Sequence, residues 1–368
     1  ILAQANCVCH VQASTTASSC TGSMAQQLSS ASLDWSKLSF DVTETAGRAE
    51  MVWKDGVWGP LTFERDPYLR LHMFANVLHY GQEAFEGLKA FHCPDGQVRI
   101  FNDGANHERM TRSCRRMMIP FVDYEMFTAA VDMAIRNNSA YIPPPDASGA
   151  SLYLRPVIFG SGPQVSLHPS KEFIFMVMVV PVGPYFKDGF KAIPGEVISD
   201  FDRAAPQGVG ACKCAGNYAA DMMPASEHKK RGFPIGLYLD AVEKRYVEEF
   251  NGANLIAITR SGKYVTPASP SILASITNAC LMQIAKDQGI EVENRRMDFK
   301  AEVEDWTEVG AVGTAAVVCP IKSLTQGGIT WNFDEEAKVL ESLFLRLTRI
   351  QRGEEPDKYG WARVVALE

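Results

Sequence analysis

The segment Gly208-Val-Gly-Ala-Cys-Lys213-Cys-Ala-Gly-Asn-Tyr218-Ala-Ala220 holds a single lysine among small, apolar and uncharged residues. No other charged side chain occurs between Arg203 and Asp221. These surroundings predict a dry, glycine-lined pocket, in which burial lowers the pKa of an amine. A neutral amine is a nucleophile and forms Schiff bases with carbonyl compounds. This segment alone also leaves open an exposed lysine on a glycine-rich loop.

The length and composition indicate a globular protein with more than one domain. A chain of 368 residues predicts two domains, because single cores stop growing at roughly 250–300 residues. Apolar residues make up 46% and charged residues 21% of the chain, and the net charge is −7. This balance argues against binding to nucleic acids or anionic membranes. The longest apolar run, 173–182, contains Pro181 and is too short to span a membrane, so it predicts a buried strand.

Nine cysteines are scattered along the chain without the spacing of a disulfide framework or a zinc site. Cys212 and Cys214 flank the isolated lysine, but no histidine or further cysteine follows at a metal-ligand spacing. We therefore expect reduced thiols in an intracellular protein and no bound metal.

Residues 1–33 contain no Asp, Glu, Lys or Arg and are rich in Ser, Ala, Thr and Gln. The segment resembles the remainder of a transit peptide, although the usual arginines are missing, and it favours a plastid or a mitochondrion. The alternative is a disordered extension of a cytoplasmic protein, with Met24 as the start of translation.

Turn residues and apolar periodicity predict two α/β domains with a cleft between them. A small N-terminal domain covers 34–180, a Pro- and Gly-rich linker covers 181–189, and a larger domain with the lysine covers 190–368. Residues 51–58 predict two strands around an Asp-Gly turn, and 309–319 predict a strand, a tight turn and a strand. One helix is expected to start at a cap, Asn102 or Asp103, and to end before Pro120. Four more are expected over 124–141, from the Lys213 loop to about Arg231, over 271–288 and over 334–351.

The motifs after this tail resemble the branched-chain amino-acid aminotransferases, which belong to the fold-type IV enzymes dependent on pyridoxal 5'-phosphate. They are, in order, Tyr80-Gly-Gln-Glu-Ala-Phe-Glu-Gly-Leu-Lys-Ala-Phe91, Arg109, Tyr153-Leu-Arg-Pro156, Lys213-x-x-x-Asn-Tyr218, Glu249, Ile276-Thr277 and Gly313-Thr-Ala315. The resemblance covers residues 35–368 and implies a homodimer with the active site in the interdomain cleft. It also implies reversible amino transfer from leucine, isoleucine or valine to 2-oxoglutarate, which yields glutamate. Methionine-derived, aromatic or D-amino acids as substrates, and a catalytically silent binding protein, remain alternatives.

The resemblance implies a role for each residue near the cofactor. Lys213 would bind the cofactor aldehyde and move the substrate proton, Tyr218 would meet the ring oxygen, and Glu249 the pyridine nitrogen. The cofactor-binding residues are then Arg109, Lys213, Tyr218, Glu249, Ile276, Thr277 and Thr314. Adjacent residues on a strand point to opposite faces, so we expect Glu248 in solvent when Glu249 faces the pocket. Arg109 and the first residues of a helix at 276–277 suit a phosphate.

The resemblance also implies the substrate-binding residues, which are Tyr80, Phe85, Tyr153, Arg155, Tyr185, Thr314 and Ala315. The aromatic rings form an apolar wall, and Arg155 offers a polar contact for glutamate. Tyr80 would come from the neighbouring subunit, and the amides of Thr314 and Ala315 would meet the substrate carboxylate.

Three positions depart from the family pattern. Asn278 replaces an arginine, so we expect the loss of a cation on the helix surface. Gly252 replaces a threonine or serine, which predicts the loss of a polar contact near the cofactor. Ala316 replaces the first cysteine of a C-x-x-C pair and leaves Cys319 alone, which predicts no disulfide switch there.

Overall fold

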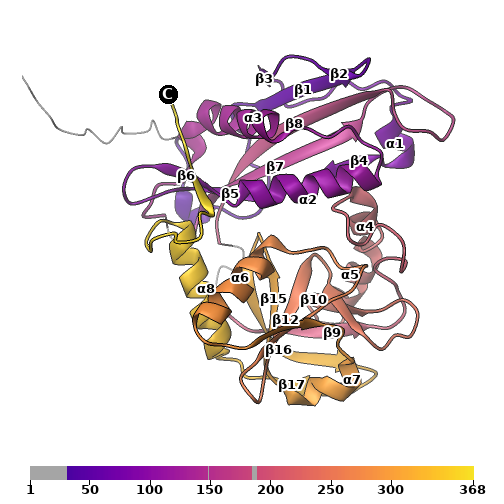
Figure 1. Cartoon of the computed structure of the whole chain (residues 1–368), viewed down its shortest axis with the longest axis vertical. Coiled ribbons are helices and arrows are strands. Elements are labelled where there is room, and N and C mark those ends of the chain that lie inside the picture. Colours follow the sequence, from indigo (N-terminus) through magenta and orange to yellow (C-terminus); the bar gives the residue numbers. More distant parts are fainter. Residues whose placement is uncertain (1–30, 148, 185–188) are drawn as a thin grey trace, which may run out of the picture.

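The computed structural model describes residues 31–147, 149–184 and 189–368. Two nine-stranded sheets lie one above the other in Figure 1, each with helices against it, and this confirms the mixed α/β class. The predictions for the tail, over residues 1–30, and for Tyr185 and most of the linker lie outside the described residues.

The first sheet is antiparallel throughout, in the order β18-β6-β5-β7-β8-β1-β2, with β3 beside β1 and β4 beside β7. Its strands are β1 (Arg48–Lys54), β2 (Val57–Trp58), β3 (Thr62–Glu64), β4 (Glu83–Phe85), β5 (Leu88–His92), β6 (Val98–Phe101), β7 (Ser151–Gly160), β8 (Glu172–Val182) and β18 (Ala362–Val365). The predicted turn between β1 and β2 is confirmed, because Trp53 pairs with Trp58 across it. Asp55 and Gly56 adopt the positive φ angles of 53° and 87° that such a turn requires.

Helices α2 (Asp103–Arg116) and α3 (Tyr124–Asn137) pack beside the first sheet. Helix α3 buries Phe127, Ala130, Val131 and Ala134 at helical spacing, and Asp123 caps its N-terminus by accepting from the Met126 amide at 2.8 Å. A side-chain cap was also predicted for α2, and this was wrong. Asn102 adopts a left-handed conformation there and makes no capping hydrogen bond.

The second sheet has the order β11-β10-β9-β16-β15-β12-β13-β14, with β17 beside β16. Its strands are β9 (Ile193–Ile198), β10 (Ile235–Leu239), β11 (Val247–Phe250), β12 (Ala253–Thr259), β13 (Tyr264–Pro267), β14 (Val292–Arg295), β15 (Trp306–Gly313), β16 (Val317–Gln326) and β17 (Ile329–Asn332). Because β11 also pairs with β12, six strands close into a ring. The predicted strand, turn and strand at 309–319 is confirmed as the end of β15 and the start of β16.

The remaining helices are α1 (Asn76–Tyr80), α4 (Ala215–Ala219), α5 (Met222–Lys230), α6 (Ile276–Asp287), α7 (Phe299–Glu302) and α8 (Lys338–Gln351), with 3-10 turns at Trp35–Lys37, Ser139–Tyr141 and Val303–Asp305. The single helix predicted after the Lys213 loop is wrong, since α4 and α5 are separate helices. Helix α6 starts at residue 276 rather than 271 because Ser275, not an earlier serine, accepts the capping hydrogen bond, from the Asn278 amide. Helices α6 and α8 share an apolar cluster with β15 and β16.

The chain passes from the first sheet to the second between β8 and β9, near the linker predicted at 181–189. Strand β8 continues to Val182, inside that interval. Strand β18 returns to the first sheet and pairs with β6, although the sequence-based boundaries assign residues 362–365 to the C-terminal domain.

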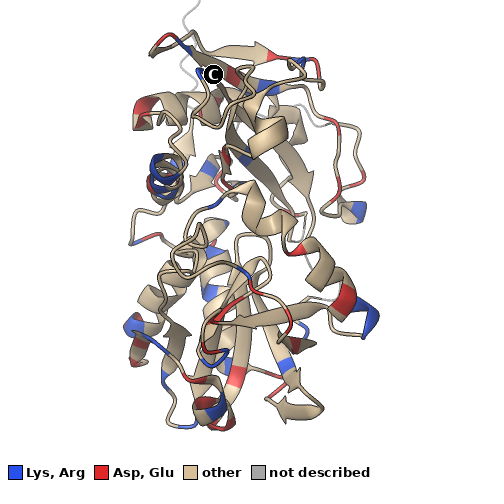
Figure 2. Cartoon of the chain, turned by 90° about the vertical axis from the view of Figure 1, so that its right-hand side faces the viewer, with Lys and Arg blue, Asp and Glu red and all other residues tan. Residues whose placement is uncertain are grey.

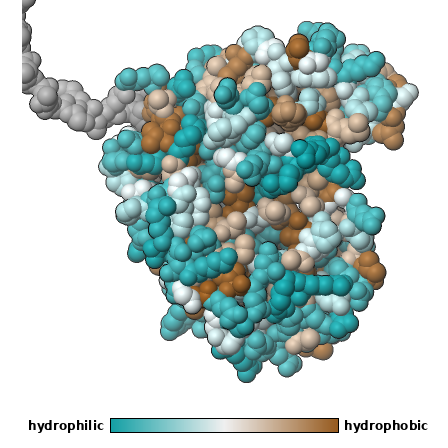
Figure 3. Space-filling model, viewed as in Figure 1, coloured by the Kyte–Doolittle hydropathy of each residue, from teal (hydrophilic) through white to brown (hydrophobic). Residues whose placement is uncertain are grey.

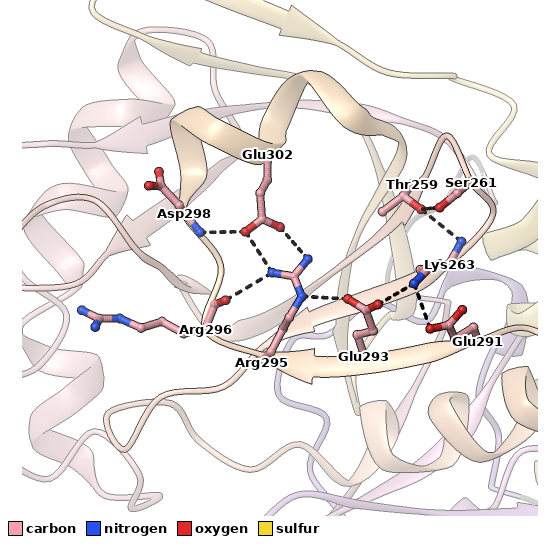
Figure 4. Close-up of polar contacts among 9 residues, drawn as sticks. All are labelled: Thr259, Ser261, Lys263, Glu291, Glu293, Arg295, Arg296, Asp298 and Glu302. Carbon is pink, nitrogen blue, oxygen red and sulfur yellow. Dashed lines mark hydrogen bonds and ion pairs between the residues drawn. The ribbon is translucent and has the colours of Figure 1, made fainter.

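Charged residues of both signs are interspersed along the helices, strands and loops (Figure 2), and the face in Figure 3 is largely hydrophilic with small hydrophobic areas. One chain of ion pairs joins the loop residue Lys263, just before β13, to β14 and α7 (Figure 4). Glu293 contacts Lys263 at 2.8 Å and Arg295 at 2.7 Å, and Arg295 also pairs with Glu302 at 2.8 Å. Exposed pairs of this kind each stabilise a fold by about 1 kcal/mol or less. Among the helices of the described residues, none has the length and apolar character of a membrane span.

Candidate active site

A cavity of about 210 Å³ lies between the two sheets. Nine of the residues predicted for the site line it, namely Phe85, Arg109, Tyr153, Arg155, Lys213, Tyr218, Glu249, Thr314 and Ala315. They come from β4, α2 and β7 on one side, and from the Lys213 loop, α4, β11 and the β15–β16 turn on the other. The cavity therefore depends on how the two sheets pack together.

Lys213 reaches the cavity with its amine surrounded by protein atoms. Its Nζ donates to the Tyr218 hydroxyl at 2.9 Å and lies 4.8 Å from the centre of the Phe85 ring. Burial is the main cause that lowers the pKa of the Lys213 amine, and the charges of Arg109 and Arg155 lower it further against the opposing charge of Glu86. The alternative of an exposed lysine on a loop is therefore excluded.

The backbone around Lys213 is held by the first sheet and its helices. The Lys213 amide donates to the Ser113 hydroxyl at 2.9 Å, and the Phe85 amide donates to the Lys213 carbonyl at 3.0 Å. Ser113 belongs to α2 and Phe85 to β4, so the backbone that carries the amine is held by elements of the first half of the chain.

Glu249 is buried on β11 and faces the same cavity. Its carboxylate accepts from the Leu273 amide at 2.9 Å and forms an ion pair of 2.7 Å with Arg203. Burial raises the pKa of Glu249 to about 7, although the Arg203 charge opposes the rise. The predicted exposure of Glu248 was wrong. Strand β11 is covered on both faces, and Glu248 accepts a hydrogen bond from Ser269 at 3.2 Å.

Arg109 lies at one end of the cavity and is paired within the protein. Its Nη2 contacts Glu86 at 2.7 Å, and its Nη1 donates to the Ala274 carbonyl at 3.1 Å, just before helix α6. Ser275 lines the cavity there, whereas the Ile276 and Thr277 side chains do not. The first amides of an α-helix lack partners within the helix, so the backbone at 276–277 can still meet an anion.

Arg155 and Tyr153 line the cavity from β7. Arg155 donates to the Tyr153 hydroxyl at 3.1 Å, and its guanidinium carbon lies 4.9 Å from the centre of the Phe85 ring. A Cβ atom at Gly87 would come within 2.2 Å of the Tyr153 hydroxyl, so glycine is needed there to keep Tyr153 in place.

The turn with Thr314 and Ala315 is supported from behind by Lys89, a residue of β5. The Lys89 ammonium donates to the Ala315 carbonyl at 2.8 Å, and burial lowers its pKa to about 8. Lys89 thereby connects the first sheet to the turn between β15 and β16.

Among the predicted substrate-binding residues that the structure describes, Tyr80 does not line this cavity. Tyr80 ends helix α1, is 42% exposed and donates its hydroxyl to the Val165 carbonyl. Tyr185 lies outside the described residues. A second, mainly apolar groove of about 500 Å³ adjoins the cavity and shares Phe85, Arg155 and Tyr218 with it.

The structure explains two of the three departures differently from the sequence. Asn278 is buried, accepts from Tyr264 at 2.6 Å and donates to Thr266 at 2.9 Å, so the predicted helix-surface position was wrong. Gly252 has φ +83°, a conformation that strains a residue with a side chain. The third departure, Ala316, leaves Cys319 alone, and Cys319 is buried, which raises the pKa of its thiol to about 12.

Known proteins resemble this chain over most of its length. The sequence profile of the family described as Amino-transferase class IV matches residues 83–324. A branched-chain-amino-acid aminotransferase of Haemophilus influenzae is 39% identical over 89% of this chain and 98% of that protein. The transaminase AMT5 of Alternaria alternata is 36% identical over 90% of this chain and 92% of that protein. The crystal structure of the Escherichia coli branched-chain amino acid aminotransferase covers 86% of this chain and 100% of its own, with a TM-score of 0.69 and 26% identity.

The chain is a class IV aminotransferase. Enzymes of this family use pyridoxal 5'-phosphate, and the donor set of the cavity fits that group. A buried amine can bind its aldehyde, a buried carboxylate can pair with its ring nitrogen, and the Arg109 end can take its phosphate. In the part of this aminotransferase that the structure describes, no group of three or more His, Cys, Asp and Glu residues gathers as for a metal ion.

Sequence reasoning missed three charged residues of this aminotransferase, namely Glu86, Lys89 and Arg203. Glu86 and Lys89 lie inside the motif of residues 80–91, where each is a charge with small or apolar residues on both sides. That pattern was a usable signal, since buried charges need partners. Arg203 was noted only as the limit of the uncharged segment around Lys213.

Proposed function

We propose that this aminotransferase moves the α-amino group of leucine, isoleucine or valine to 2-oxoglutarate and so produces branched 2-oxo acids and glutamate. One observation carries the proposal: beside the Lys213 amine, the cavity has an aromatic wall of Phe85 and Tyr153 with a single arginine, Arg155, against it. An apolar wall suits a branched aliphatic side chain, and a guanidinium suits the second carboxylate of glutamate. The relatives in Haemophilus influenzae and Escherichia coli are branched-chain amino-acid aminotransferases, which supports the same substrates.

Pyridoxal 5'-phosphate, when bound, supplies an aldehyde that takes up the amino group and a ring that accepts electrons from the substrate α-carbon. We assign its aldehyde to Lys213, its ring oxygen to Tyr218, its ring nitrogen to Glu249, and its phosphate to Arg109, the backbone at 276–277 and the Thr314 hydroxyl. The Arg109 guanidinium is oriented for this by Glu86, which contacts both its Nε and its Nη2 atoms.

Lys213 is the group that moves the proton. Because burial favours the uncharged form of its amine, Nζ can take the proton from the substrate α-carbon. The Tyr218 hydroxyl at 2.9 Å then accepts a hydrogen bond from the protonated Nζ and holds it within the cavity. The surrounding protein atoms keep water away from this amine during the transfer.

The substrate carboxylate is assigned to the amides of Thr314 and Ala315, in a turn that Lys89 holds by the Ala315 carbonyl. The positive charge of Lys89, a residue of β5, lies against this turn and favours an anion there. The side chain of the substrate then lies toward Phe85, Tyr153 and Arg155.

We further propose a homodimer, in which the apolar groove beside the cavity is covered by a second copy of the chain. The support is a group of exposed apolar residues near the groove, Leu69, Met73, Phe74, Leu78, Val165, Leu167 and Met222, because monomers rarely expose such a surface. Tyr80 belongs to the same region, and in the dimer it would contribute to the partner's site. Size-exclusion chromatography with light scattering tests the mass of the particle.

A panel of amino acids tests the substrate assignment. The purified enzyme with its cofactor is mixed with one amino acid at a time, and the loss of the cofactor's visible absorbance is followed. Leucine, isoleucine, valine and glutamate are expected to react at comparable rates, while D-amino acids remain inert. A fungal relative is named as a transaminase without a branched-chain substrate, so methionine-derived and aromatic amino acids are tested as the second choice. Failure of leucine to react would remove the proposed activity.

A further inference from the structure

The guanidinium of Arg203 lies against the carboxylate of Glu249. Nη2 of Arg203 and Oε1 of Glu249 are 2.7 Å apart, and the side chains are only 9% and 5% exposed. Arg203 belongs to a segment without helix or strand, ten residues before Lys213. Both members of the pair line the cavity.

The same Nη2 atom connects three segments of the site. It donates to the carbonyl of Gly210 at 2.8 Å, three residues before Lys213, and to the carbonyl of Ser271. Ser271 in turn lies two residues before Leu273, whose amide donates to Glu249. A Cβ at Gly210 would come within 2.2 Å of the Ser271 carbonyl oxygen, so the segments meet closely here.

Arg203 is also a cation near three carboxyl groups, of which those of Glu248 and Glu249 are buried and that of Asp221 is half-buried. Its charge lowers the pKa of Asp221, Glu248 and Glu249, whereas burial raises the pKa of each. At Glu249 the Lys213 charge adds to the effect of Arg203, and Glu248 opposes it. Removal of Arg203 would leave burial as the dominant influence and favour a protonated Glu249.

We propose that Arg203 is a positioning residue that favours the ionised form of the Glu249 carboxylate, aims it into the cavity and ties it to the loop with Lys213. The inference rests on the proposed function, in which Glu249 faces the pyridine nitrogen of the cofactor. Arg203 acts on that nitrogen through Glu249, because a carboxylate stabilises a protonated pyridine whereas a neutral carboxyl group does not.

Carbon-13 NMR of glutamate carboxyl groups tests the electrostatic part in the full-length protein without cofactor. The Glu249 signal is assigned by its disappearance in Glu249→Gln. In Arg203→Gln its titration midpoint is expected to rise by at least about one pH unit. Arg203→Lys, which keeps the charge, should restore most of the wild-type value. The control Arg231→Gln, which loses an exposed ion pair with Glu196, should leave the midpoint unchanged. An unchanged midpoint in Arg203→Gln overturns the proposal.

A double-mutant cycle on the affinity for pyridoxal 5'-phosphate separates this role from a merely structural one. Arg203→Gln and Glu249→Gln are each expected to weaken binding by about tenfold or more, and the double variant should resemble Glu249→Gln within about twofold. Additive losses would contradict the proposal. The double variant removes both charges of the ion pair, so together with Arg203→Lys it decides the question even if Arg203→Gln does not fold. Neither measurement involves an amino acid, so a failure of the substrate proposal would leave both results intact.

Discussion

The amine of Lys213 donates to the hydroxyl of Tyr218 across 2.9 Å, although burial favours the uncharged lysine and raises the pKa of the tyrosine to about 12. Both shifts favour the uncharged form of the two groups. A neutral amine beside a neutral hydroxyl can take up a proton without first losing one. The reactivity of Lys213 depends on this environment.

Substitution of Lys213 by alanine should abolish the transfer, because no other amine reaches this position in the described part of the cavity. We expect turnover with leucine to fall by at least about 10³-fold. Borohydride reduction of the wild-type enzyme with cofactor, followed by peptide mapping, should label Lys213. Lys300→Ala, on the surface of α7, is the control. Full turnover by Lys213→Ala would refute the assignment.

Replacement of Arg155 by leucine should separate the two substrates. The KM for 2-oxoglutarate should rise by about tenfold or more, since a charge-assisted contact is lost, while the KM for leucine changes by less than about threefold. Steady-state kinetics with each substrate varied in turn measures both values. The exposed Arg112→Leu on α2 provides the matched loss of charge. Equal effects on both substrates would show that Arg155 does not read the second carboxylate.

Lys89 should control the binding of the substrate carboxylate in a pH-dependent way. Burial lowers its pKa to about 8, so Lys89 carries its charge below that pH and loses it above. In the wild-type enzyme, the KM for leucine should therefore rise as the pH passes about 8. Lys89→Met should raise the KM for leucine by about tenfold, leave kcat less affected and remove this pH dependence. Lys89→Arg should keep a low KM for leucine both below and above pH 8. A loss confined to kcat would argue against this role.

Glu249 should make the protein without cofactor less stable as the pH rises. Its pKa is about 7 in the folded protein, whereas the ordinary pKa of a glutamate is 4.5, so the folded state binds an extra proton between these two pH values. Stability from this group is present below about pH 4.5 and is lost as the pH passes about 7, by up to about 3 kcal/mol. Urea unfolding at pH 5 and pH 8 should show a smaller decrease for Glu249→Gln than for the wild type. Equal decreases would place the folded pKa of Glu249 near its ordinary value.

Local sequence patterns predicted those parts of the site that depend on neighbouring residues. The isolation of Lys213 among uncharged residues indicated its pocket, and the Gly-Thr-Ala segment indicated a turn between two strands. Helix α6 was placed too early because Ser271 and Ser275 are equally good caps by residue type. Only the contacts of the folded chain distinguish them.

Contacts between distant segments could not be predicted from one sequence. Lys89 and Ala315 are 226 residues apart, and Arg109 and Glu86 are 23 apart. Both contacts arise from the packing of strands and helices, which leaves no periodic signal. The burial of Glu248 has the same origin, because the alternation of strand faces gives no information about what covers each face.

The position of β18 has a consequence for how the polypeptide acquires its structure during synthesis. Strand β6 obtains its outer neighbour from residues 362–365, more than 250 positions later in the chain. Until those residues leave the ribosome, β6 presents an unpaired edge to other nascent chains. The half of the enzyme that is translated first is thus the half whose sheet is completed last.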